Sequence, residues 1–250
     1  MSLLWRNKQL RIGLAPDRIH VSGARSVELA GADGSWNVPL AALPAALAGQ
    51  KGEASLVLAD QFVRYALLPW NETLKTREQW AALATHRFNT LHGPRAMDWQ
   101  INVADTAPMG ARLACAVDRT LINQLAEIFV QANIRLGSVQ PFLVHAFNRI
   151  RKSVGNGSCW IVVEEPGRLT LALIQRGMWV AIRGRRADQG WRNVLPEILE
   201  RESAFLGLSQ PVTRVIICAQ GDFDTAHFSD LYEAWRTEAL AYRELALAAE

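Results

Sequence analysis

Cysteine is scarce in this sequence, and its scarcity excludes two structural classes. The chain has three cysteines, Cys115, Cys159 and Cys218, an odd number at wide spacings. None belongs to a C-x-x-C pair or to a Cys/His cluster, so neither a disulfide framework nor a zinc site is expected. Each cysteine lies in an apolar stretch, which predicts a small buried side chain in a reducing compartment.

Long apolar runs are also missing. No stretch approaches the roughly 20 apolar residues that a membrane-spanning helix needs. The first residues, which include Arg6 and Lys8, are charged too early to hold the apolar core of a signal peptide. We therefore expect a cytoplasmic chain whose link to a membrane comes through a partner.

The familiar catalytic motifs are absent as well. The sequence contains no G-x-S-x-G, no P-loop and no H-E-x-x-H. His86 and His92 fall on one predicted helix but on different faces, which does not suit a shared metal ion. The formal net charge of +3 is too small to indicate nucleic-acid binding without clustering on one face. The sequence thus predicts no catalytic residue and no metal site.

What is present is an ordinary globular composition, with 50% hydrophobic and 20% charged residues. A chain of 250 residues can bury a sizeable core as one large domain or two small ones. Nine tryptophans are spread from Trp5 to Trp235, which favours a mostly structural use of their large rings.

The first half of the chain alternates between strand and helix patterns. Thr76 and Gln79 can form a capping box for a helix that Gly93 ends, and Asp118 can cap another. A further helix begins near Pro141. Strands are predicted at 10–14, 19–22, 55–59, 62–68, 99–103, 113–117 and 134–139, with one more at either 27–29 or 36–38.

The polar break at residues 155–158 separates two halves of similar plan. After it the pattern predicts strands at 159–164, 169–174 and 178–182, a helix at 191–206 and a strand at 214–218. A final helix is expected from Ser229, with an apolar stripe of Leu231, Trp235, Ala239, Tyr242 and Leu245.

Each half therefore opens with a meander of strands and closes with helix, strand and helix. This is the plan of a duplicated, ribonuclease H-like α/β fold, although alternating helices and strands alone also allow other α/β folds. We predict a first lobe at 1–154 that carries an inserted subdomain and a reduced second lobe at 155–250.

The segment at 56–70 carries a family resemblance. Its features are Asp60 in a turn, Val63 and Arg64 opening the second strand, and an apolar closure that ends in Pro69 and Trp70. In these features and in element order the chain resembles the GspL-type cytoplasmic domains of type II secretion and the PilM-type proteins of type IV pili. Both belong to the actin-like ATPase superfamily.

The resemblance implies a bilobed actin-like fold and a scaffold role without catalysis, as in a pseudo-ATPase. It implies a place on the cytoplasmic side of an inner-membrane assembly platform. The expected partner is a membrane-anchored pilus or secretion assembly protein that binds through a cytoplasmic tail, and a secretion-type ATPase is a second candidate. GspL-type chains continue into a transmembrane helix, whereas this sequence stops at Glu250 and in that respect is closer to PilM-type proteins.

Actin-type nucleotide sites need two glycine-bearing hairpins with acidic residues around the phosphates, and a glycine pair beneath the adenosine. The matching positions here are Gly13, Glu165, Gly167 and Gly221. The first hairpin lacks the Asp-x-Gly-Ser/Thr pattern, and Pro16 removes an amide donor. We expect no ATP hydrolysis and no bound cofactor. The alternative is a divergent ATPase or kinase that binds magnesium nucleotide through Glu165 and Gly167.

Two places suit a protein partner. Arg64, Pro69 and Trp70 lie along the signature segment, and Trp179 and Trp191 flank a basic segment that begins at Arg183. Arg151 and Lys152 can join residues 183–186 in one basic patch. The default interpretation of residues 183–186 is a solvated loop, and the alternative is a site for an anionic tail, a lipid headgroup or nucleic acid. A nucleic-acid-binding module is the weaker alternative.

Overall fold

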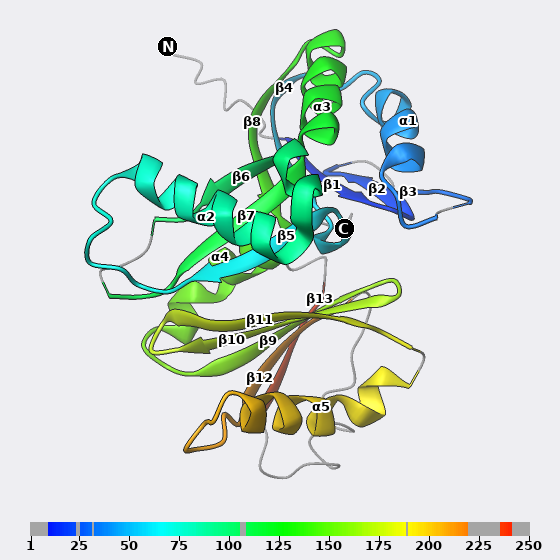
Figure 1. Ribbon diagram of the computed structural model, residues 1–250. Helices are drawn as coiled ribbons and strands as arrows, with labels where there is room; N and C mark the ends of the chain where they lie inside the picture. Colours follow the sequence, from blue (N-terminus) through cyan, green and yellow to red (C-terminus); the bar gives the residue numbers. More distant parts are fainter. Residues whose placement is uncertain are drawn as a thin grey trace, which may run out of the picture.

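The computed structural model describes residues 10–23, 26–31, 33–105, 109–188, 190–219 and 236–241. Its strands form two five-stranded sheets and one three-stranded sheet. The two larger sheets lie one above the other, and the small sheet projects to one side (Figure 1). Among the described residues, no helix is both long and apolar enough to cross a membrane.

The first large sheet has the strand order β3-β2-β1-β4-β8. Strands β1 and β2 form an antiparallel hairpin, whereas β4 pairs in parallel with both β1 and β8. Helices α1 and α3 cover one face, where Leu14, Leu56, Leu125 and Phe129 form part of a buried core. The elements are β1 (Leu10–Ala15), β2 (Arg18–Val21), β3 (Val27–Glu28), α1 (Asn37–Ala46), β4 (Gly52–Leu58), α3 (Arg119–Gln131) and β8 (Ile134–Pro141).

The small sheet is inserted between β4 and α3. Its antiparallel order is β5-β7-β6, and helix α2 buries Trp80, Ala84 and Phe88 against it. The predicted capping box of Thr76 and Gln79 is confirmed. The elements are the 3-10 turns η1 (Asp60–Phe62) and η2 (Gly93–Asp98), β5 (Val63–Leu68), α2 (Arg77–His92), β6 (Trp99–Val103) and β7 (Arg112–Asp118).

The second large sheet has the order β11-β10-β9-β12-β13. Helix α5 covers one face, where Trp160, Leu171 and Ile217 are buried. Helix α4 lies against the other face and also packs on Val57 of the first sheet. The elements are α4 (Phe142–Val154), β9 (Cys159–Glu165), β10 (Arg168–Gln175), β11 (Met178–Arg186), α5 (Trp191–Phe205), β12 (Arg214–Ala219) and β13 (Arg236–Ala241).

The structure decides between the two candidates for the third strand, and it shows that one prediction of secondary structure is wrong. The residues at 36–38 begin helix α1, and the third strand is the other candidate, β3. The predicted final helix is replaced at 236–241 by strand β13, which pairs in parallel with β12 and contains Ala239. Hydrogen bonding to a neighbouring strand has overridden the helix propensity of this segment. The remaining members of the predicted stripe, Leu231, Trp235, Tyr242 and Leu245, lie outside the described residues.

Candidate functional site

The cleft between the β1–β2 hairpin and the β9–β10 turn is the place where the sequence predicted a degenerate nucleotide site. Gly13 and Glu165 line one cavity there, together with His20 and Phe142. Its volume is about 50 Å³, whereas small-ligand sites have volumes of roughly 300 Å³ or more. Gly167 lines a different cavity on the other side of the turn, and Gly221 lies outside the described residues.

The Glu165 side chain forms a hydrogen bond with another part of the same chain. Its Oε1 accepts a hydrogen bond of 2.9 Å from the backbone N–H of Asp60. The Asp60 carboxylate accepts hydrogen bonds from the Tyr65 hydroxyl and, at 3.0 Å, from the Leu143 backbone N–H. Asp60 and Glu165 are only 0% and 5% exposed. These contacts tie the first sheet, the inserted sheet, helix α4 and the second sheet together at one point.

Burial sets the ionisation of this pair. It raises the pKa of Asp60, against the Tyr65 and Leu143 hydrogen bonds and the charge of Arg168, which lower it. Burial, and after it the nearby Asp60 carboxylate, raises the pKa of Glu165 well above its usual range.

A magnesium nucleotide therefore does not fit the described part of the cleft. The cavity is small, and the walls contributed by Leu14, Ala15, Val57 and Ala59 are apolar. The nearest acidic side chain, Glu165, already binds a backbone amide of its own chain.

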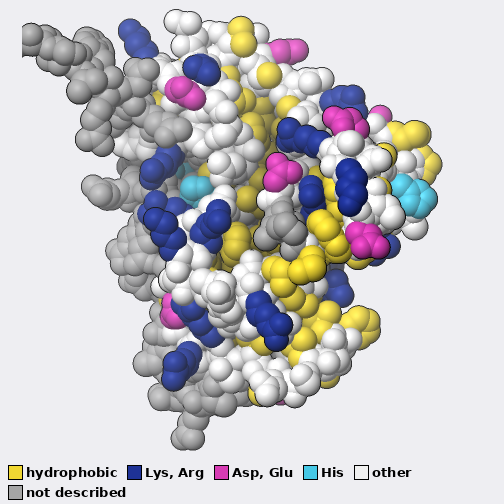
Figure 2. Space-filling model, turned by 90° about the vertical axis from the view of Figure 1, so that its left-hand side faces the viewer, with side chains coloured by type: hydrophobic (Ala, Val, Ile, Leu, Met, Phe, Trp, Pro, Cys, Tyr) yellow, Lys and Arg dark blue, Asp and Glu magenta, His cyan; other side chains and the backbone are white. Residues whose placement is uncertain are grey.

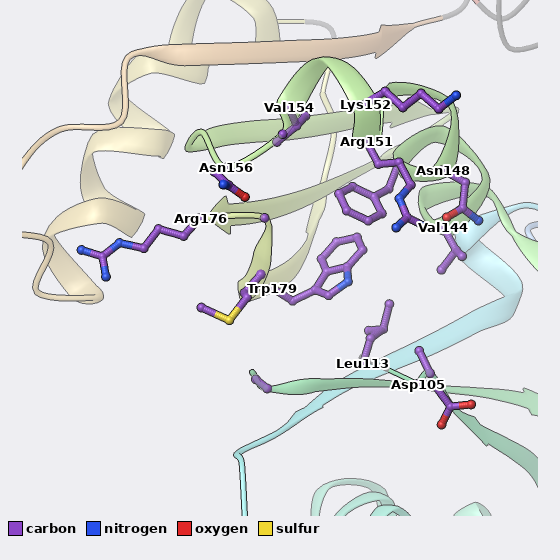
Figure 3. A pocket seen from close by; sticks show the side chains of 16 residues that line it. Asp105, Leu113, Val144, Asn148, Arg151, Lys152, Val154, Asn156, Arg176 and Trp179 are labelled. Atoms are coloured by element: carbon purple, nitrogen blue, oxygen red, sulfur yellow. The ribbon is translucent and has the colours of Figure 1, made fainter. Parts of the chain in front are cut away.

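A larger groove lies on another side of helix α4. It encloses about 580 Å³ and is bounded by α4, the start of β7 and the β10–β11 turn. Leu113, Val144 and Trp179 lie around its centre, and Asp105 lies on the wall opposite α4 (Figure 3). The Trp179 ring packs on Phe147, with 4.6 Å between the ring centroids.

The rim of this groove is mainly basic. Arg151 and Lys152 line it from the last turn of α4, and Arg176 does so from the β10–β11 turn. A space-filling view of this side shows a hydrophobic band down the middle, with Lys and Arg side chains on both sides of it (Figure 2). An apolar floor with a cationic rim suits a peptide that carries both apolar and acidic side chains.

The structure separates the predicted basic patch into two. Arg151 and Lys152 line the groove near Met178, whereas Arg185 and Arg186 line a cavity at the other end of β11. At a strand rise of about 3.3 Å per residue, the two ends of β11 are roughly 26 Å apart. The prediction of a single patch is wrong, because a β-strand separates the two groups.

The predicted partner-binding residues have different environments. Arg64, Pro69 and Trp70 are exposed and do not belong to the groove lining. Trp179 is 7% exposed and contributes to the groove wall, and Trp191 is 5% exposed. Arg183 is exposed and pairs with Glu202 at 3.6 Å. Both tryptophans are buried, and their role in partner binding stays a prediction.

Sequence reasoning missed most of the groove. Val144, Phe147 and Asn148 come from α4, and Leu113 comes from a strand of the inserted sheet. The available signal was the apolar stripe of α4, of which Phe147 is a member. No sequence pattern indicated that this stripe would extend beyond the core to an open groove.

The sheets and their order define the class of protein. Two large sheets pack against a shared helix, and a small sheet is inserted into the first half, so this is a bilobed α/β chain with the actin-like fold. No protein-family model matches the sequence, and no curated protein matches it.

Solved structures match almost the whole chain at low sequence identity. The PilM-PilN type IV pilus biogenesis complex matches with a TM-score of 0.67 at 12% identity, over 98% of this chain and 91% of that one. The cytoplasmic domain of EpsL, an inner-membrane component of the Vibrio cholerae type II secretion system, matches with a TM-score of 0.57 at 12% identity. The match covers 95% of this chain and 92% of that one. A Bacteroides thetaiotaomicron protein with an actin-like ATPase fold and unknown function matches with a TM-score of 0.58 at 13% identity. The match covers 96% of this chain and 94% of that one. At these identities the likeness establishes the fold.

Proposed function

We propose that this chain is a non-catalytic cytoplasmic scaffold of a type IV pilus or type II secretion-like assembly platform. In this role it binds a segment of a membrane-anchored partner and is held at the inner membrane by it. The observation that carries the proposal is the groove of about 580 Å³, with its apolar floor and basic rim. The fold it shares with the PilM-PilN complex and with the EpsL cytoplasmic domain supports this choice of machine.

The groove also indicates the chemistry of the bound segment. Leu113, Val144 and Trp179 offer apolar contacts, and Arg151, whose side chain points toward them in Figure 3, offers charge for an acidic side chain. The proposed occupant is therefore a short peptide with apolar anchors and at least one Asp or Glu. A secretion-type ATPase remains a further proposed partner, for which the groove provides no specific feature.

Photocrosslinking in the native host tests this proposal. A photoreactive phenylalanine analogue at Val144 is expected to capture a membrane-anchored protein. The same analogue at Val130, which is 78% exposed on α3, serves as the control. Capture of the same protein from both positions, or of no membrane protein from Val144, would count against the groove as the binding site.

A second experiment measures the contribution of the apolar floor. Synthetic peptides that represent the cytoplasmic tail of the captured protein are titrated against the full chain by calorimetry. Val144→Glu is expected to weaken binding at least about tenfold, because it places a charge on the apolar floor. Val130→Glu is expected to bind like the parent chain.

The absence of catalysis is tested by a thermal-shift titration with ATP and magnesium. A ligand at about 100 times its dissociation constant stabilises the folded state by about 2.7 kcal/mol, which is readily visible. We expect no shift. A magnesium-dependent shift that Glu165→Ala removes would favour the alternative, a divergent ATPase or kinase.

A further inference from the structure

A separate cavity lies at the far end of β11 and is lined by arginines. It encloses about 380 Å³ between Gln61 of η1, the β9–β10 turn and the last residues of β11. Arg168, Arg185 and Arg186 line it. It shares only Pro166 with the lining of the interlobe cavity and no residue with the lining of the groove, so it is distinct from both.

The sheet register places two of these arginines opposite each other. Arg168 of β10 and Arg186 of β11 are direct partners in the antiparallel pair. Like charges directly opposite each other on neighbouring strands are destabilising unless a counter-charge lies between them. Burial, and after it the charge of Arg168, lowers the pKa of Arg64, so a further guanidinium contributes to the same positive field.

The described acidic residues leave this charge incompletely balanced. Glu202 binds both Arg183 and Arg185, at 3.6 and 2.5 Å. Within the described part of the chain, Arg168 and Arg186 form no ion pair. Asp60 lies close enough for the Arg168 charge to lower its pKa, but burial outweighs this effect and raises that pKa overall.

Arg168 is held in position by a glycine. A Cβ atom added at Gly184 would lie 2.8 Å from Arg168 Nη2 and 3.3 Å from Cζ, so the guanidinium rests directly over this residue. The Nε of Arg168 is buried and has no hydrogen-bond partner among the described residues. The side chain is thus pre-organised and has an unused donor.

We propose that this cavity binds a phosphate-bearing anion, with the guanidinium groups of Arg168 and Arg186 as its principal ligands. Guanidinium forks match the geometry of phosphate oxygens and remain charged at all physiological pH values. The volume lies in the range of small-ligand sites, which suits a phosphate ester or a diphosphate. Such an anion could be a free metabolite or the headgroup of an anionic phospholipid.

The test uses the full chain and distinguishes these two sources. Pyrophosphate is titrated by calorimetry at constant ionic strength, with chloride as the reference anion. In parallel, flotation is measured with vesicles of phosphatidylcholine alone and of phosphatidylcholine mixed with phosphatidylglycerol. Binding of pyrophosphate alone identifies a free phosphate compound, and binding of the anionic vesicles identifies a headgroup.

Three variants locate the site. Arg186→Gln, at an exposed position, is expected to weaken the observed binding at least about tenfold. Gly184→Ala retains every charge but displaces Arg168, and a loss of similar size is expected. Arg201→Gln removes an exposed arginine from α5 of the same lobe and is expected to bind like the parent chain.

The proposal is overturned if neither probe binds above the chloride or phosphatidylcholine reference. It is equally overturned if all three variants bind like the parent chain, or if Arg201→Gln loses as much affinity as Arg186→Gln. The last outcome would indicate attraction by net charge without a defined site.

Discussion

Asp60 and Glu165 are 105 residues apart in the sequence and meet in the interior of the molecule. Asp60 begins the 3-10 turn after β4, and Glu165 ends β9. One oxygen of each carboxyl group, Oδ2 of Asp60 and Oε2 of Glu165, has no hydrogen-bond partner among the described residues. A buried polar atom without a partner is costly, and a proton held on one carboxyl reduces the cost of burying two negative charges.

This arrangement predicts a specific pH dependence of stability. Because burial raises the pKa values of both groups in the folded state, the folded chain holds more protons than the unfolded chain at intermediate pH. Their contribution to stability is fully present below about pH 4, near the unfolded pKa values, and is lost as the pH rises through the folded pKa values.

Glu165→Gln removes one of these titrating groups and retains an oxygen that can accept from the Asp60 N–H. We expect the free energy of unfolding of the variant, relative to the parent, to increase by on the order of 1 kcal/mol between about pH 5 and pH 8. Urea denaturation at several pH values measures this. Glu200→Gln, at an exposed position on α5, is the control and should leave the pH profile unchanged. Parallel profiles for Glu165→Gln and the parent would contradict the assignment.

The sequence indicated Glu165 but not its role. The Glu-x-Gly turn led to the hypothesis of a phosphate-binding acid, and Asp60 was interpreted only as a turn residue of the signature segment. Whether an acidic side chain binds a ligand or a backbone amide depends on what the other half of the chain places beside it. That information is tertiary, and no local pattern contains it.

At the scale of elements, helix α2 begins where its sequence predicts. The Thr76 hydroxyl accepts from the Gln79 N–H, and the Gln79 side chain accepts from the Thr76 N–H, so the two ends of the capping box satisfy each other. Thr76→Ala is expected to cost about 1 kcal/mol in the free energy of unfolding. Thr90→Ala in the same helix removes a hydroxyl bound to the His86 carbonyl and raises helix propensity, so it should be neutral or stabilising. Urea denaturation measures the free energy of unfolding of both variants. Equal changes in the two would show that the capping box does not stabilise the helix.

The β10–β11 turn closes one end of the groove and allows a second test. Gly177 has a φ of +72°, and a Cβ atom there would lie 2.9 Å from the Gly155 carbonyl oxygen. Gly207 has a φ of +64° with nothing within 4 Å of its Cβ position. Gly207→Ala should lower the free energy of unfolding by about 1 kcal/mol, because of backbone strain alone. Gly177→Ala should lower it by at least about 2 kcal/mol, because the strain is joined by a collision with the carbonyl oxygen. Thermal denaturation of both variants measures the difference, and equal costs would mean that the turn does not contact residue 155.

Elements with a clear hydrophobic period were predictable, and elements without one were not. The strands of both large sheets up to β12 and helices α2 to α5 follow their apolar patterns. Helix α1 was missed because Pro39 and Pro44 argue against a helix. Pro39 is tolerated because it lies in the first turn, where its missing N–H has no partner to lose. Strand β13 was missed because its Glu, Ala and Leu residues favour a helix, and only pairing with β12 makes it a strand.

At the scale of the whole molecule, α4 is the element that decides how the halves are coupled. Its side chains Phe142, Leu143, Ala146 and Ile150 lie in one buried cluster with Val57 of the first sheet. The same cluster contains Ile161, Ala172 and Ile216 of the second sheet. The predicted division at 154 and 155 places α4 with the first lobe, yet the second sheet needs α4 to cover one of its faces. The sequence showed the duplication of the two halves but not this shared core, because the periodicity of α4 gives its apolar face without identifying the sheets it covers.

We therefore predict that the two lobes unfold together in one cooperative transition. Two cysteines serve as probes, Cys115 in the first lobe and Cys218 in the second. Burial raises the pKa of each thiol to about 12, so both should be unreactive in the folded state. Their alkylation, followed by mass spectrometry across a urea series, should show the same midpoint for the first and the second lobe. Leu143→Ala, at a fully buried position in α4, should cost about 3 kcal/mol and lower both midpoints equally. If only one midpoint moved, or if Cys218 became reactive at lower urea than Cys115, the lobes would be separate folding units and the shared core would not couple them.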